Sequence, residues 1–186
     1  MVKLVDRILM DWVRTGNEAE AKDLIQRNGA KVDVNAKDKL GMTPLHWAVT
    51  NRHASLLKLL IDSDAYVNAK DKLGETPLHR AAQMSEVRAC EELLDAGANV
   101  NARDERGRTA LHWAIHGGVA FTEVCKVLIE NGADVNAQDR DGYIPVKYAA
   151  RYGINFQHIF AMIEAERLPK VHDGSFVMPA NKSVDI

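Results

Sequence analysis

The sequence predicts an all-α solenoid of about five helix-turn-helix units joined by β-hairpin-like loops. The first observation is a period: Asp-x-x-Gly recurs at 38–41, 71–74, 104–107 and 139–142, with spacings of 33, 33 and 35 residues. The second is that Val-Asn-Ala recurs in phase at 34–36, 67–69, 100–102 and 135–137. A period of roughly 20 to 50 residues indicates stacked units, each too small to bury its apolar face alone.

Each unit carries the residues that begin and end helices. Thr43, Thr76 and Thr109 stand where a helix is expected to begin, and a threonine hydroxyl can satisfy a free backbone N–H there. Proline follows the first two threonines, at the first helical position, where no N–H is missed. Gly97 and Gly132 follow the second apolar run and are typical helix-end signals. Each unit is therefore predicted to run turn, helix, helix, loop.

The first unit, about residues 4–37, is predicted to be an N-terminal cap. Its apolar residues follow the i, i+3, i+4, i+7, i+8 spacing of one helical face. They are Val5, Ile8, Leu9, Trp12 and Val13. Gly16-Asn17 is expected to turn the chain into a second helix at about 18–27. The unit lacks the Thr-Pro-Leu-His block of later units, as expected where an end face meets water.

The middle units are predicted at about 38–70, 71–103 and 104–138. Two extra residues in the last of these fall between its helices, around Phe121, as either a tolerated loop insertion or a partner contact. A degraded unit at about 139–168 is predicted to be the C-terminal cap, which completes a domain over 1–168. Pro169 is expected to stop its helix, and the aperiodic segment 169–186 is predicted to be a flexible tail.

Composition and charge give no sign of a nucleic-acid-binding, membrane-spanning or secreted protein. Apolar residues make up 46% and charged residues 27%, and the net charge is −2, so nothing indicates direct binding of nucleic acid. No apolar run approaches the ~18 residues of a membrane helix, so no membrane partner is expected. Lys3, Asp6 and Arg7 interrupt any signal-peptide core, which predicts a cytoplasmic and/or nuclear chain. Cys90 and Cys125 share one repeat position and are expected to be buried thiols.

Several in-phase blocks carry a family resemblance. Thr-Pro-Leu-His at 43–46 and 76–79, Thr-Ala-Leu-His at 109–112 and Gly-Ala-Asn/Asp-Val-Asn-Ala at 97–102 and 132–137 resemble the ankyrin repeat, over roughly residues 5–168. The resemblance implies that the histidine of each block ties neighbouring turns together by hydrogen bonds. It also implies a non-catalytic interaction module, an adaptor or scaffold, whose turn tips and inner helix faces bind a partner.

The resemblance places partner-binding residues at the variable positions of the turn tips and inner helices. They are Lys39, Leu40, Met42, Lys72, Leu73, Glu75, Arg80, Met84, Arg103, Arg106, Arg108, His116, Arg140, Tyr143, Arg151 and Tyr152. Basic side chains outnumber acidic ones at the tips, which favours a protein or peptide with an acidic surface. The alternative is that these side chains only keep an exposed edge soluble. Trp47 and Trp113, which flank Arg80 in the repeat register, are either packing residues or aromatic anchors for the partner.

Two alternative interpretations of the residues stay open beside that function. His112 and His116 lie four residues apart on one predicted helix and suit a metal, which leaves a metal-binding or enzymatic protein as an alternative. No third ligand and no known catalytic motif accompanies them, so we predict no enzyme and no cofactor. Residues 37–48 resemble a unit in the regulatory subunit of a transcription complex, which is a second alternative.

The asparagines of the Val-Asn-Ala triplets match a position that is hydroxylated in ankyrin repeats of animal cells. They are Asn35, Asn68, Asn101 and Asn136. Hydrogen bonding within the loops explains the same asparagines without any modification. The chain alone is predicted to be monomeric.

Overall fold

The computed structural model describes residues 3–28, 31–115 and 121–151, and within these ranges the chain is a stack of paired helices without strands. The helices are α1 (Leu4–Thr15), α2 (Glu18–Asn28), α3 (Pro44–Thr50), α4 (Ala54–Asp62), α5 (Pro77–Gln83), α6 (Val87–Asp95), α7 (Ala110–Ala114), α8 (Phe121–Glu130) and α9 (Pro145–Arg151). The all-α repeat architecture is confirmed. The end of the fifth unit, Pro169 and the tail lie outside the described residues, so the predicted domain boundary stays a prediction.

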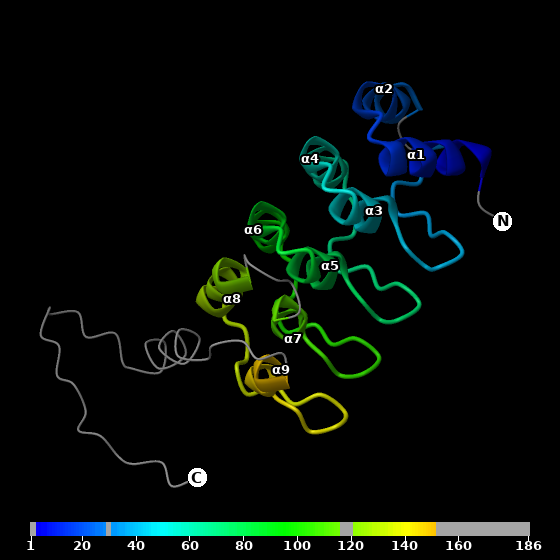
Figure 1. The fold of residues 1–186 in the computed structure, drawn as a ribbon. Helices are drawn as coiled ribbons and strands as arrows, with labels where there is room; N and C mark the ends of the chain where they lie inside the picture. The colour runs from blue at the N-terminus through cyan, green and yellow to red at the C-terminus, as the bar shows by residue number, and fades with distance from the viewer. Residues whose placement is uncertain (1–2, 29–30, 116–120, 152–186) are drawn as a thin grey trace, which may run out of the picture.

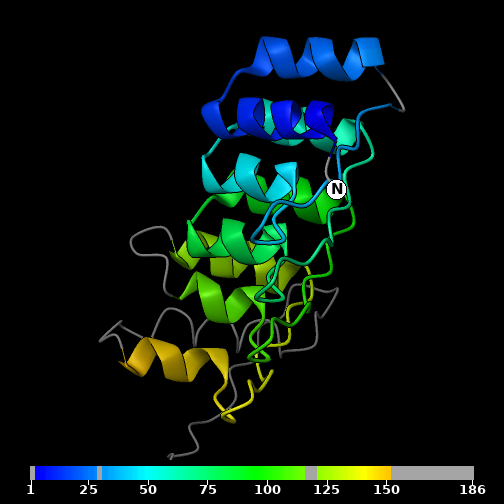
Figure 2. The same ribbon diagram turned by 90° about the vertical axis from the view of Figure 1, so that its right-hand side faces the viewer.

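The helices form two columns, and the loops extend along one edge of the stack (Figure 1). The inner column packs α1 on α3, α3 on α5, α5 on α7 and α7 on α9, while α2, α4, α6 and α8 stack in the outer column. Figure 2 shows the same stack turned by 90°, with the loops again gathered at one side. Because the loops join successive units in the same way, their tips form a continuous edge beside the inner helices.

The core repeats with the period of the sequence. Leu45, Leu78 and Leu111 occupy one position of successive inner helices and are buried. Cys90 and Cys125 are likewise buried at one position of the outer helices and are free thiols, as expected. Burial raises the pKa of each thiol to about 12. Both cysteines therefore act as small core residues that stay protonated at neutral pH.

The threonine and histidine of each block form the start of an inner helix. The side chain of Thr43 accepts a hydrogen bond from the backbone N–H of His46, and Nδ1 of His46 accepts one from the backbone N–H of Thr43. Nε2 of His46 then donates to the carbonyl oxygen of Glu75 in the next unit, 3.1 Å away. His79 and His112 repeat the arrangement, with the carbonyl oxygens of Arg108 and Tyr143 as acceptors. The histidine tie expected from the resemblance is confirmed.

Each loop also contacts the next through its backbone. The backbone N–H of Lys72 donates to the carbonyl oxygen of Leu40, and Glu105 and Arg140 repeat this bond one and two units later. Gly41 lies at φ 79°, and a Cβ atom placed on it would be 2.8 Å from the backbone nitrogen of Lys72. Glycine is therefore needed there both for the left-handed turn and for the close approach of the next loop.

Candidate functional site

The exposed ends of the loops are held by one aspartate each. We call residues 37–42, 70–75, 103–108 and 138–143 fingertips one to four. In fingertip one, Oδ1 of Asp38 accepts the backbone N–H groups of Leu40 and Met42, at 2.8 and 3.0 Å. Asp71, Asp104 and Asp139 do the same in the other three fingertips. These bonds fix the backbone of each fingertip and turn its aspartate inward.

The second oxygen of each aspartate binds a side chain of the following inner helix. Oδ2 of Asp38 accepts Nε1–H of Trp47 at 2.9 Å, and the same position, nine residues after the aspartate, provides the donor in every unit. The other donors are Arg80, Trp113 and Tyr148. Half-burial and this bond favour the packing interpretation of Trp47 and Trp113 over that of aromatic anchors.

Arg80 and Arg108, which the sequence analysis placed among the partner-binding residues, form ion pairs within the repeat stack. Arg80 forms ion pairs with Asp71 at 3.1 Å and with Glu75 at 2.8 Å, and its side chain is only 23% exposed. Arg108 pairs with Asp104 at 2.8 Å, lies 4.0 Å from the ring centroid of Trp113 and is 15% exposed. Their charges are compensated within the protein, so they add little to a basic surface.

The sequence placed Met42 and Glu75 at the exposed tips, and the structure corrects this. Met42 is 4% exposed and Glu75 is 2% exposed. Both residues directly follow the turn glycine, where the chain returns to the stack. The carbonyl oxygen of Glu75 accepts the hydrogen bond from His46 there. Burial raises the pKa of Glu75. These two side chains are therefore part of the interior and cannot carry the specificity of an open surface.

The remaining fingertip residues are exposed and lie in rows. Leu40 and Leu73 are 58% and 56% exposed, and Tyr143 is also exposed. The exposed charged residues that accompany them are Lys39, Lys72, Glu105, Arg106, Arg140 and Asp141. Behind them, Nζ of Lys37 donates to the carbonyl oxygen of Lys70, and Nζ of Lys70 donates to that of Arg103, each at 2.8 Å. Arg103 continues this row by donating to Gln138.

The candidates on the inner helices are divided by what the structure describes. Met84 is half-buried directly after α5, and its carbonyl oxygen accepts a hydrogen bond from Arg52. His116, Tyr152 and the side chain of Arg151 lie outside the described residues. The row of fingertips is therefore the part of the predicted site that the geometry brings together.

The metal alternative depends on His112, whose two ring nitrogens are both engaged. Nδ1 accepts the backbone N–H of Thr109 at 3.1 Å, and Nε2 donates to the carbonyl oxygen of Tyr143 at 3.1 Å. A metal ion needs a free nitrogen lone pair, so these bonds compete with ligation. Within the described ranges, no group of three histidine, cysteine, aspartate or glutamate residues is arranged to hold a metal ion.

The asparagines of the triplets join adjacent loops. Asn35 donates from Nδ2 to the carbonyl oxygen of Asp64 at 3.2 Å, and its Oδ1 accepts the backbone N–H of Tyr66 at 2.7 Å. Asn68 and Asn101 make the same two bonds one and two units later. Loop hydrogen bonding thus accounts for these side chains, while hydroxylation of Asn35, Asn68, Asn101 and Asn136 stays a prediction.

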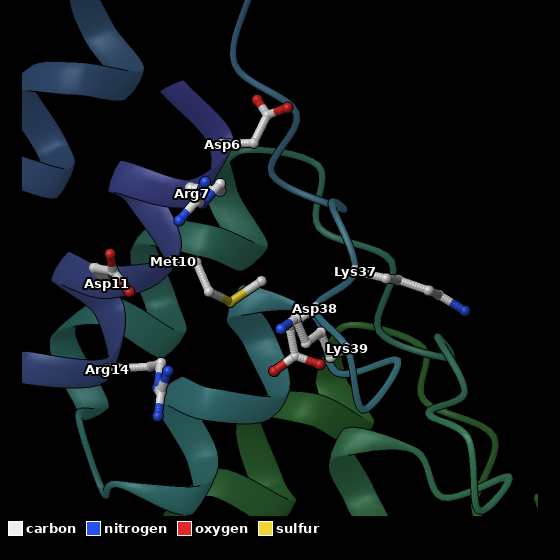
Figure 3. Close-up of a pocket in the computed structure, with 8 residues that line it drawn as sticks. All are labelled: Asp6, Arg7, Met10, Asp11, Arg14, Lys37, Asp38 and Lys39. Atoms are coloured by element: carbon white, nitrogen blue, oxygen red, sulfur yellow. The ribbon is translucent and has the colours of Figure 1, made fainter. Parts of the chain in front are cut away.

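A pocket that the sequence did not predict lies between α1 and fingertip one (Figure 3). Its volume is about 600 Å³, and α1 lines it with Asp6, Arg7, Met10, Asp11 and Arg14 while the loop provides Lys37, Asp38 and Lys39. The guanidinium group of Arg14 lies 4.4 Å from the ring centroid of Trp47. The only sequence signal was the spacing of residues 7, 10, 11 and 14, which places them on one face of α1.

Comparisons with known proteins agree with this architecture. Residues 9–104 match the family model for ankyrin repeats (3 copies), and residues 93–149 match the model for ankyrin repeats (many copies). Over 48 residues the chain is 42% identical to acyl-CoA-binding domain-containing protein 2 of Arabidopsis thaliana, covering 26% of this chain and 14% of that protein. Over 55 residues it is 40% identical to 26S proteasome non-ATPase regulatory subunit 10 of Dictyostelium discoideum, covering 30% and 23%.

These matches support the repeat rather than any whole protein, since the chain spans only 14% and 23% of those two relatives. Among the residues that the structure describes, no helix has the length and hydropathy needed to cross a membrane.

Proposed function

Because the chain belongs to the ankyrin-repeat family, we propose that it is a non-catalytic adaptor or scaffold module that binds a protein or peptide with an acidic surface. The binding face comprises the four fingertips and the adjoining inner helices. The observation that carries the proposal is the row of exposed fingertip side chains, in which basic residues outnumber acidic ones and Leu40, Leu73 and Tyr143 provide apolar surface. Exposed leucines among lysines give both burial and charge complementarity to a partner.

The revised binding set keeps only fingertip residues whose side chains are exposed to solvent. It consists of Lys39, Leu40, Lys72, Leu73, Arg103, Arg106, Arg140 and Tyr143. Arg80 and Arg108 support this set through the aspartates of their fingertips. Residence in the cytoplasm and/or nucleus, a monomeric state and membership of a transcription complex remain predictions.

The proposal is tested by affinity capture from a lysate of the source organism followed by mass spectrometry. The fingertip variant carries Lys39→Glu, Lys72→Glu, Arg106→Glu and Arg140→Glu. A matched control reverses one exposed charge on each outer helix, with Lys22→Glu, Lys58→Glu, Arg88→Glu and Lys126→Glu. Circular dichroism checks that both variants are folded.

We expect a protein that is captured by the wild type and by the outer-helix control and lost by the fingertip variant. Equal capture by all three proteins would move the site away from the fingertips. The absence of any specifically captured protein would contradict the adaptor function itself.

A further inference from the structure

The first two fingertips differ in charge from the last two. Fingertips one and two expose Lys37, Lys39, Lys70 and Lys72 and expose no acidic side chain, a net charge of +4. Their aspartates are bound internally and Glu75 is buried. Fingertips three and four expose three arginines against Glu105 and Asp141, a net charge of +1. Positive potential is therefore concentrated at the N-terminal end of the edge.

Apolar side chains follow the same division. Leu40 and Leu73 occupy one repeat position, more than half exposed, whereas Arg106 and Asp141 occupy it in the last two units. The bond from the backbone N–H of Lys72 to the carbonyl oxygen of Leu40 keeps the two leucine-bearing turns adjacent. Two adjoining exposed leucines at a rigid turn suit an apolar side chain of a partner.

The pocket beside α1 continues this surface, because Lys37 and Lys39 belong to both. Three acidic residues are among those that line the pocket. Asp38 accepts hydrogen bonds from Leu40 and Trp47. Asp6 is buried, and its Oδ1 accepts the backbone N–H of Asp33 at 2.9 Å. Among the described residues that line the pocket, Asp11 is thus the one exposed acid, against Arg7, Arg14, Lys37 and Lys39. Met10 extends from α1 toward Asp38 and Lys39 (Figure 3), but it is only 7% exposed, so the exposed apolar surface is provided by Leu40 and Leu73.

We propose that this N-terminal end of the groove binds an acidic peptide segment that carries apolar side chains. Peptide carboxylates lie against Arg14, Lys39 and Lys72, and peptide apolar side chains pack on Leu40 and Leu73. The inference deepens the proposed function and rests on it. Exposed leucines among the cations favour such a peptide over RNA, because RNA bases stack on aromatic rings and the ring of Trp47 is already in contact with Arg14.

The test begins with selection of a random-peptide display library on the full chain. We expect the enriched peptides to be acidic and to contain aliphatic or aromatic residues. An enriched peptide is then synthesised with a fluorescent label, and its Kd is measured by anisotropy at low and high salt. High salt is expected to weaken binding, because the lysines and arginines concerned are exposed.

Paired variants locate the site. Lys39→Glu with Lys72→Glu is expected to raise the Kd by about tenfold or more, while Arg106→Glu with Arg140→Glu makes the same charge change and is expected to alter it less than about threefold. Leu40→Ser with Leu73→Ser should also weaken binding. Leu4→Ser, at an exposed position at the start of α1, is the apolar control.

The inference would be overturned if no peptide is enriched, if neutral or basic peptides are enriched, or if both charge variants weaken binding equally. Tighter binding of a labelled poly(U) RNA that is sensitive to the Lys39/Lys72 variant would overturn it in favour of RNA. If a protein captured from lysate is lost in the four-fingertip variant but kept in the Lys39/Lys72 variant, the adaptor function stands and this location fails. If neither lysate nor library yields a ligand, both fail.

Discussion

Nε2 of His46 donates a hydrogen bond to the backbone carbonyl oxygen of Glu75, 3.1 Å away and 29 residues along the chain. The bond joins the start of one inner helix to the fingertip of the next unit. It requires the tautomer with its proton on Nε2, because Nδ1 accepts the backbone N–H of Thr43. The neutral imidazole is thus part of the interface between units, which links stacking to pH.

Stability is expected to fall as the pH drops below about 6.5. Burial lowers the pKa of His46 to about 4, and it also lowers the pKa of His79 and His112. A group with a lowered folded-state pKa contributes stability above its unfolded pKa, and loses it as the pH falls toward the folded value. For His46 alone the loss between pH 7 and pH 4 is on the order of 3 kcal/mol.

Urea denaturation over this pH range measures the effect. The His46→Asn variant serves as the control, because it removes one of the three buried histidines whose pKa is lowered and should give a shallower dependence on pH. An equal slope in both proteins would show that His46 does not take up a proton on unfolding.

Truncation of the repeated core leucine is expected to destabilise the whole stack. Leu78→Ala leaves a cavity at a position that is 1% exposed, which should lower the free energy of unfolding by about 2–5 kcal/mol. Leu73→Ala removes the same atoms from an exposed fingertip and should change it by less than about 0.5 kcal/mol. Urea denaturation followed by circular dichroism compares them, and similar losses would contradict the assignment of core and surface.

The turn glycines allow backbone strain to be separated from crowding. Gly41 and Gly142 have φ values of 79° and 77°, but of the two only Gly41 has, among the described residues, a neighbouring backbone within 4 Å of an added Cβ atom. Gly142→Ala is expected to cost about 1–2 kcal/mol through the left-handed conformation alone. Gly41→Ala should cost more, because the fingertip of the next unit must move. Thermal unfolding of both variants checks the order, and equal costs would mean that the next loop yields easily.

One substitution is expected to stabilise the protein. Asp64 adopts φ 63° at the repeat position where Gly97 and Gly132 adopt 87° and 84°. Asp64→Gly removes the strain of a non-glycine residue and should raise the free energy of unfolding by about 0.5–1 kcal/mol. The control is Gly97→Asp, which introduces the same strain one unit later and should destabilise by a similar amount. A loss of stability in Asp64→Gly would show that the aspartate makes a compensating contribution.

Local signals explain why the helices were predictable. Thr43 and Thr76 with their prolines begin α3 and α5 as expected, and the apolar spacing of residues 5–13 lies within α1, which ends at Thr15 directly before the expected turn at Gly16. Each of these signals acts within a few residues of chain, and repetition in phase reinforces it. The same holds for the fingertips, whose Asp-x-x-Gly turns recur in phase and place each glycine at a positive φ.

The candidate site was predictable only in outline. Exposed Lys39, Leu40, Lys72 and Leu73 lie where the repeat register placed them, but Met42 and Glu75, assigned to the same tips, are buried. The register shows which residues are equivalent, but not how far each side chain is covered by the next unit. The pocket between α1 and fingertip one was missed for the same reason, since its two walls belong to different units.

The period, the helix starts and the turn glycines follow from the sequence alone, because each depends on residues that recur at fixed spacing. The tie between histidine and the next turn was expected only from the resemblance to ankyrin repeats. Which charged side chains face the solvent depends on the packing between units and could not be predicted from the sequence. Arg80 and Arg108, like Lys39 and Lys72, are basic residues at variable positions of the repeat. Unlike the lysines, they form ion pairs with Asp71, Glu75 and Asp104 and are largely buried in the stack. A buried ion pair requires that opposite charges lie close together and that both are shielded from solvent. The spacing of residues along the chain specifies neither the distance nor the shielding.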